Sequence, residues 1–125
     1  MITIKEADAA TYEKWHRDEH MPFHALGMHM QDGSRYIGYI WYETAGELLR
    51  ILRLEAPDML LAEGLVRAAL HYADCRSIES GVCSIEQWAA LWNHLGFISN
   101  GQPDREEWKV SIREFFSRPC HGHAP

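Results

Sequence analysis

Several features that mark large classes of protein are missing from this chain of 125 residues. No apolar run approaches the roughly 20 residues that a helix needs to cross a bilayer, and residues 1–15 are too charged for a secretory signal peptide. Basic residues are also few, with 12 Lys and Arg against 18 Asp and Glu, and they form no cluster that could neutralise a phosphate backbone. We therefore expect a cytoplasmic protein that binds neither nucleic acid nor membranes.

Cysteine is equally scarce. The three cysteines, Cys75, Cys83 and Cys120, are odd in number and widely spaced, which argues against a disulfide framework. Cys75 and Cys83 are expected to pack as small apolar side chains, because the spacing of the sequence places no base beside either thiol. The chain also lacks repeats and long linkers, and its length suits one core. We predict a single domain over residues 1–118 and a flexible tail over residues 119–125.

What the sequence does contain is an alternation of strand and helix patterns. Runs of apolar and aromatic residues predict strands at residues 1–5, 23–31, 35–42, 48–54 and 78–83. Apolar residues three and four apart predict helices at residues 58–75 and 85–94, the first of them beginning at Asp58. Asp8 as an N-cap and Pro22 as a terminator predict another at residues 8–20. Residues 108–112 alternate as in a strand, although Asp104 could instead cap a helix there. The order of these elements predicts a small α/β (α+β) domain.

Three segments in the middle of the chain resemble the GNAT superfamily of acyl-CoA-dependent N-acyltransferases. They are the strand at residues 36–40, the helix at residues 65–73 and the segment Leu-Trp-Asn-His-Leu-Gly-Phe at residues 91–97. The resemblance covers residues 36–97 well and the rest only by the order of the elements. It implies a mixed, mostly antiparallel sheet flanked by helices, and it favours the strand at residues 108–112. The region before the hairpin has room for one helix where the family usually has two.

The resemblance implies acetyl-CoA or another acyl-CoA as cofactor and a small-molecule or peptide amine as acceptor. In this family the fourth strand and the start of the following helix hold the cofactor. The positions that correspond to them here are Leu52, Arg53 and Leu54 on the strand, and Leu60, Leu61 and Ala62 at the helix.

The segment that corresponds to the family's pyrophosphate loop departs from its pattern. The family has Arg/Gln-x-x-Gly-x-Gly/Ala, because glycines let phosphate oxygens reach backbone N–H groups at a helix N-terminus. Residues 57–62 have the sequence Pro-Asp-Met-Leu-Leu-Ala, so only Ala62 fits and Leu60 replaces a glycine. Asp58 would cap the helix with a carboxylate that takes N–H donors and repels an anion. We expect CoA to bind weakly or not at all.

The candidates for catalysis are two carboxylates and a histidine. Glu55, just past the fourth strand, and Glu47, at its start, could each deprotonate an amine if burial raised the pKa of the carboxyl group. The alternative for both is a solvated strand end. The family's usual proton-transfer tyrosine corresponds to Trp92, whose indole is not an acid. His94 could substitute, although two residues along a helix turn it by about 200°.

Histidines near residue 20 raise a metal-site hypothesis that the sequence does not favour. His16 and His20 would share one helix face with His24 nearby, but Pro22 must end the helix before His24 can be placed. Cys120 and His123 are a weaker pair, because a free tail seldom preorganises ligands. We therefore expect no metal.

Two functions remain open at this point. One is an acyl-CoA-dependent N-acyltransferase with an unusual phosphate site, and the other is a GNAT-like module without catalysis that serves in regulation, ligand binding or protein interaction. Trp41, Trp88, Trp92 and Trp108 should pack in the core or at a subunit interface. A homodimer is expected, because a partner would cover apolar surface that a shortened fold exposes.

Overall fold

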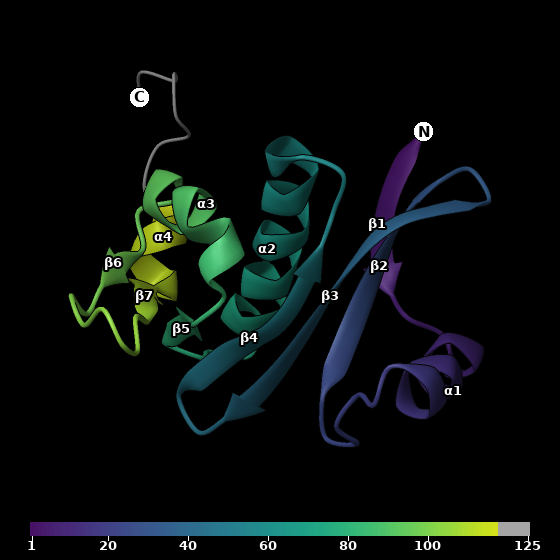
Figure 1. Ribbon diagram of the computed structural model, residues 1–125, viewed down its shortest axis with the longest axis horizontal. Coiled ribbons are helices and arrows are strands. Elements are labelled where there is room, and N and C mark those ends of the chain that lie inside the picture. The colour runs from purple at the N-terminus through teal and green to yellow at the C-terminus, as the bar shows by residue number, and fades with distance from the viewer. Residues whose placement is uncertain (118–125) are drawn as a thin grey trace.

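The computed structural model describes residues 1–117, which form one sheet of seven strands with four α-helices around it (Figure 1). The strands are β1 (Ile2–Glu6), β2 (Leu26–Asp32), β3 (Arg35–Ala45), β4 (Leu48–Glu55), β5 (Ser80–Cys83), β6 (Ile98–Ser99) and β7 (Trp108–Ser111). The helices are α1 (Ala9–Asp18), α2 (Met59–Asp74), α3 (Ala89–His94) and α4 (Ile112–Ser117), and a short 3₁₀ helix, η1 (Glu86–Trp88), leads into α3. The strand order is β1-β2-β3-β4-β5-β7-β6, and only β4 and β5 pair in parallel. The predicted fold class is confirmed.

The sheet separates two groups of buried side chains, because successive residues of a strand point to opposite faces. On one face, Ile40 and Tyr42 of β3 belong to the main core, which includes the buried residues of α2. On the other face, Trp41 packs with Trp15 of α1 in a smaller cluster. Figure 1 accordingly has α1 and α2 on opposite sides of the strands. We call these sides the α1 face and the α2 face.

α1 is fixed to the sheet through one glycine of β2. The Tyr12 hydroxyl accepts a hydrogen bond from the Gly27 N–H at 2.8 Å and donates one to the Gly27 carbonyl at 3.3 Å. A Cβ atom at Gly27 would lie 2.5 Å from the Trp15 ring, so the indole packs where a side chain would otherwise stand. Asp8 caps α1 as predicted, because its carboxylate accepts from the Thr11 N–H at 2.8 Å.

The first helix is shorter than predicted. It ends at Asp18 rather than near His20, because the Met21 N–H donates to the Trp15 carbonyl, six residues back, in the pattern that closes a helix C-terminus. This closes the helix before Pro22 is reached. His20 has a φ of 56° and lies outside the helix.

Other boundaries also differ from the sequence prediction. β2 begins at Leu26 rather than at residue 23, because a turn bonds the Ala25 N–H to the Pro22 carbonyl. The strand predicted near residues 108–112 is confirmed as β7, which ends at Ser111. The alternative helix capped by Asp104 is wrong, because Asp104 lies in a turn and α4 begins only at Ile112. β6 was not predicted. No helix among residues 1–117 is long and apolar enough to cross a membrane, and the predicted tail, with its cysteine and histidines, lies outside the described residues.

Candidate functional site

The parallel strands β4 and β5 separate halfway along β4. They pair over residues 48–51 and 80–83, after which β5 ends and β4 continues to Glu55. β4 carries a bulge at the same point: Tyr42 pairs with Ile51 and Trp41 pairs with Arg53, which makes Leu52 an extra residue. Residues 52–55 therefore have a paired strand on one side only.

Trp88 occupies part of this free edge. Its indole N–H donates to the Leu54 carbonyl at 2.9 Å, and its half-buried ring packs against the main core. The indole of Trp92 is fully buried and donates to the Ile85 carbonyl at 2.9 Å. Both rings pack in the core, which is one of the two locations predicted for them. The sequence did not indicate that Trp88 bonds to the predicted cofactor strand.

The N-terminus of α2 is capped by the chain itself. The Asp58 carboxylate accepts from the Leu61 N–H at 2.9 Å, and the Asp58 carbonyl accepts from the Ala62 N–H at 3.0 Å. Asp58 therefore caps α2 as predicted and places a negative charge where a helix N-terminus would otherwise attract an anion. Of the predicted cofactor residues at this end, Ala62 is fully buried and Leu60 is 77% exposed.

A pocket of about 540 Å³ opens on the α1 face, between α1 and the sheet. The register of the strands builds its floor, because Lys5 pairs with His29, His29 with Tyr39, and Tyr39 with Glu55. Directly paired residues share a face of the sheet, so these side chains form a row across β1, β2, β3 and β4. His29, Tyr39 and Glu55 line the pocket, and Trp15 of α1 forms part of its wall.

His29 is the buried polar side chain of this pocket. It is 3% exposed, and its Nδ1 has no hydrogen-bond partner among residues 1–117. Burial lowers the pKa of His29, so the imidazole is neutral at pH 7. A second bulge, at Ile37, turns Tyr36 to the α1 face. There the Tyr36 ring meets the His29 ring edge to face, with 4.9 Å between the ring centroids.

Three charged side chains line the pocket, those of Glu19, Glu55 and Lys14. The guanidinium of Arg53 lies 3.5 Å from the Glu19 carboxylate and 4.0 Å from the Glu55 carboxylate. It also lies 4.9 Å from the centre of the Trp41 ring. Arg53, which the resemblance placed at the cofactor, is therefore engaged on the α1 face. One guanidinium between two carboxylates leaves a negative charge, and Lys14 of α1 opposes it from the same lining.

The predicted catalytic residues lie in three different places. Glu55 lines the pocket, whereas Glu47 lies at the opposite end of β4, where its carbonyl accepts from the N–H groups of Glu79 and Ser80. His94 lies at the end of α3, with its Nε2 3.3 Å from a carboxylate oxygen of Glu63 on α2. The pocket therefore brings in Glu55 and neither of the other two.

The histidines near residue 20 have separate neighbours. His16 packs against Phe23 with 4.7 Å between the ring centroids, and His24 pairs with Glu43. Because His20 has left the helix, the predicted pairing of His16 and His20 on one helix face is wrong. Within residues 1–117, no group of three or more His, Cys, Asp or Glu residues is arranged to hold a metal ion.

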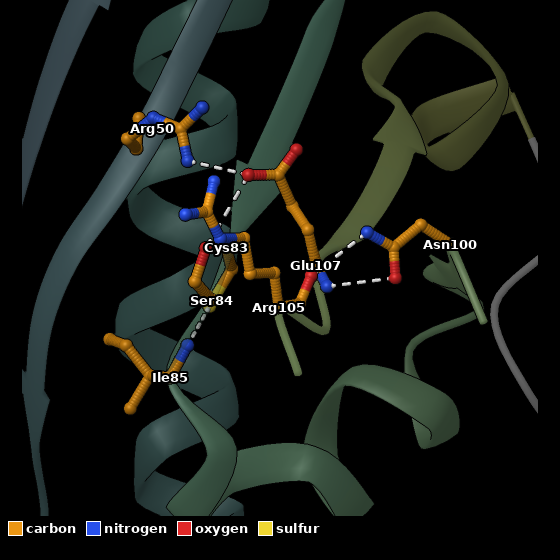
Figure 2. A network of polar contacts seen from close by, with 7 residues as sticks. All are labelled: Arg50, Cys83, Ser84, Ile85, Asn100, Arg105 and Glu107. Carbon is orange, nitrogen blue, oxygen red and sulfur yellow. Dashed lines mark hydrogen bonds and ion pairs between the residues drawn. The ribbon is translucent and has the colours of Figure 1, made fainter. Parts of the chain in front are cut away.

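A polar network ties β4 to the end of β5 and the start of β7 (Figure 2). Arg50 of β4 donates to the Glu107 carboxylate at 2.9 Å, and the Ser84 hydroxyl donates to the same oxygen at 3.4 Å. Asn100 holds the loop before β7 by accepting from the Glu107 N–H at 3.2 Å. This network fixes the paired half of β4, just before the point where β5 departs.

The two described cysteines differ in exposure. Cys83 is fully buried at the end of β5, as predicted, and burial raises the pKa of its thiol to about 12. The prediction for Cys75 is wrong, because this residue is exposed and its Sγ lies 3.5 Å from Nε2 of His71. The buried stripe of α2 ends at Ala73, so Cys75 lies beyond it.

No family model matches the sequence, and no curated protein matches it. Solved structures do match it. A ribosomal-protein-alanine N-acetyltransferase from Escherichia coli has a TM-score of 0.68 at 13% identity and 100% coverage of both chains. Mutant forms of the spermidine/spermine N-acetyltransferase from Vibrio cholerae have a TM-score of 0.70 at 12% identity, over 94% of this chain and 99% of that one. The fold is that of the GNAT superfamily.

Another GNAT-fold neighbour was solved with coenzyme A. This PaiA N-acetyltransferase from Thermoplasma acidophilum has a TM-score of 0.70 at 11% identity, over 89% of this chain and 99% of that one. Identities this low establish the GNAT fold and leave the activity open. At both positions where the resemblance places acyl-CoA, groups of the chain itself are already bound: Trp88 at the β4 edge and Asp58 at α2. The homodimer and the cytoplasmic location stay predictions.

Proposed function

We propose that this chain is a ligand-binding module with a GNAT fold, which does not hold acyl-CoA in the ordinary way and takes its ligand in the α1-face pocket. The observation that carries this proposal is the hydrogen bond that the Leu61 N–H donates to the Asp58 carboxylate at 2.9 Å. The carboxylate occupies a donor that a pyrophosphate would need and repels the anion. Residues 57–62 contain no basic side chain to offset that charge.

Calorimetry and thermal shift with CoA and acetyl-CoA test the proposal. A ligand that binds only the folded state must raise its stability. We expect no stabilisation of the unmodified protein by either compound at roughly 1 mM, which corresponds to less than about 4 kcal/mol of binding free energy. A Kd of about 1 μM or tighter would refute the proposal and favour an enzyme.

A small amine-bearing molecule is the class of ligand that suits the pocket. Three aromatic rings line it and can hold a cation over their faces, those of Trp15, Tyr36 and Tyr39. The carboxylates of Glu19 and Glu55 share one guanidinium and can receive an amine, while Lys14 in the same lining balances their remaining negative charge. Spermidine and spermine, named for one of the neighbours, belong to this class.

Spermidine is a suitable probe of the pocket, with two matched variants. Glu55→Gln removes a carboxylate from the lining, whereas Glu47→Gln removes one from the opposite end of β4. We expect spermidine to raise the melting temperature of the wild type and of Glu47→Gln, and to raise that of Glu55→Gln less. Equal shifts in all three proteins would exclude the pocket as the amine site.

The second candidate function is an acyl-CoA-dependent N-acyltransferase. It is favoured by the separation of β4 from β5 at the Leu52 bulge, with Glu55 further along the same strand. If CoA binds despite Asp58, Glu55 is the candidate general base. Glu55→Gln should then lower turnover by about 10²- to 10⁴-fold, and Glu47→Gln should not.

A further inference from the structure

Residues 52–55 of β4 form a strand edge with which another extended chain could pair. β3 covers the opposite edge up to Glu55, and β5 ends opposite Ile51. The N–H and C=O of one strand residue point to the same edge, so both groups of Leu54 face the side from which Trp88 approaches. An unpaired edge of this kind is a template for amide-bearing ligands.

We propose that Trp88 determines which ligands reach this edge, by holding the Leu54 carbonyl and excluding extended, amide-bearing chains. Its Nε1 donates at 2.9 Å, the position from which a ligand amide would donate. The turn that carries Trp88 is itself fixed. The Ile85 carbonyl accepts from the Trp88 N–H at 3.3 Å and from the Trp92 indole at 2.9 Å. The inference rests on the proposed function in one respect, that the unmodified protein does not hold acyl-CoA.

Trp88 and Asp58 oppose different parts of a CoA molecule, so the choice of probe separates them. The Asp58 carboxylate repels phosphates at the N-terminus of α2. The Trp88 indole occupies the Leu54 carbonyl, to which a ligand amide would donate at the edge of β4. CoA carries both kinds of group. Pantetheine carries amides and a thiol but no phosphate, so it meets the barrier at Trp88 alone.

The experiment measures pantetheine binding by calorimetry to the wild type, Trp88→Ala and Trp88→Phe, with folding checked by circular dichroism. Trp88→Ala empties the edge, and Trp88→Phe removes the donor while keeping most of the ring, which protects the fold. Trp108→Phe is the matched control, because its buried indole N–H has no hydrogen-bond partner among residues 1–117. We expect Trp88→Ala to bind pantetheine at least about tenfold more tightly than the wild type, Trp88→Phe to gain less, and Trp108→Phe to gain nothing.

Two results would overturn this role of Trp88. One is equal pantetheine affinity of the wild type and the folded Trp88 variants, and the other is an equal gain in Trp108→Phe. If Trp88→Ala does not fold, Trp88→Phe decides the question by the same comparison. Tight binding of CoA to the wild type would refute the proposed function instead, so the two failures are distinct.

Discussion

The Asp58 cap can be tested by two substitutions that separate its hydrogen bond from its charge. Asp58→Ala removes the acceptor that receives the Leu61 N–H at 2.9 Å, whereas Asp58→Asn keeps an oxygen acceptor and removes the charge. Loss of such a cap costs about 1 kcal/mol, and Asn caps about as well as Asp. We expect Asp58→Ala to lower the melting temperature by about 4 °C for a domain of this length. Asp58→Asn should leave it nearly unchanged.

Urea unfolding followed by circular dichroism measures both variants on one scale. A loss in Asp58→Asn as large as that in Asp58→Ala would mean that the charge stabilises the helix through its dipole, and high salt should then reduce the loss. An undiminished stability in Asp58→Ala would refute the capping argument.

The same position tests the electrostatic barrier to CoA. Asp58→Asn should improve CoA binding without a loss of stability, because the cap remains and the repulsion is removed. The combination of Asp58→Gly with Leu60→Gly should improve it further, although glycine inside a helix costs about 1 kcal/mol. A folded double variant that binds CoA no better than the wild type would show that repulsion at α2 is not what excludes the cofactor.

The glycine beneath Trp15, the two thiols and the buried histidine each give a simpler test. Gly27→Ala should lower the free energy of unfolding by about 1–3 kcal/mol, because its Cβ would lie 2.5 Å from the Trp15 ring; an unchanged urea midpoint would contradict that packing. Iodoacetamide at pH 7 should alkylate Cys75 and spare Cys83 in the native protein, as read by peptide mass spectrometry. The free energy of unfolding should fall as the pH drops below about 6.5. The reason is that burial lowers the pKa of His29 in the folded protein, so His29 binds a proton more readily in the unfolded chain. His29→Gln should flatten that part of the profile, and an unaltered slope would exclude His29 as its source.

Elements that depend on local patterns could be predicted from the sequence. The hairpin of β3 and β4 and the helix α2 follow from apolar periodicity, since buried positions repeat every two residues in a strand and every 3.6 in a helix. The caps at Asp8 and Asp58 were also visible, because a capping carboxylate bonds to an N–H only three residues away. Glu55 could be placed at a strand end, because it directly follows the apolar run of residues 48–54. It does line the pocket.

The rest of the pocket depends on pairing between strands, which no local pattern reveals. His29 and Tyr39 become neighbours through the register of β2 and β3. The bulge at Ile37 then turns Tyr36 to the α1 face, whereas unbroken alternation would place Tyr36 on the opposite one. Trp88 poses the same difficulty, because its partner is a carbonyl 34 residues earlier in the chain. These long-range contacts decide the candidate site.

β4 contributes to both the α1-face pocket and the strand edge at Trp88, through groups that point in different directions. The Leu54 side chain is buried on the α2 face and its carbonyl bonds to Trp88 at the edge, while Glu55 lines the pocket on the α1 face. Because these groups diverge, a change at the edge should not alter contacts in the pocket. We expect Trp88→Ala to leave spermidine binding unchanged, and Glu55→Gln to leave pantetheine excluded. For each probe, the change in binding free energy in the double variant should equal the sum of the changes in the two single variants within about 0.5 kcal/mol. Calorimetry with spermidine and with pantetheine measures these changes. A larger coupling energy would show that the edge and the pocket form one site.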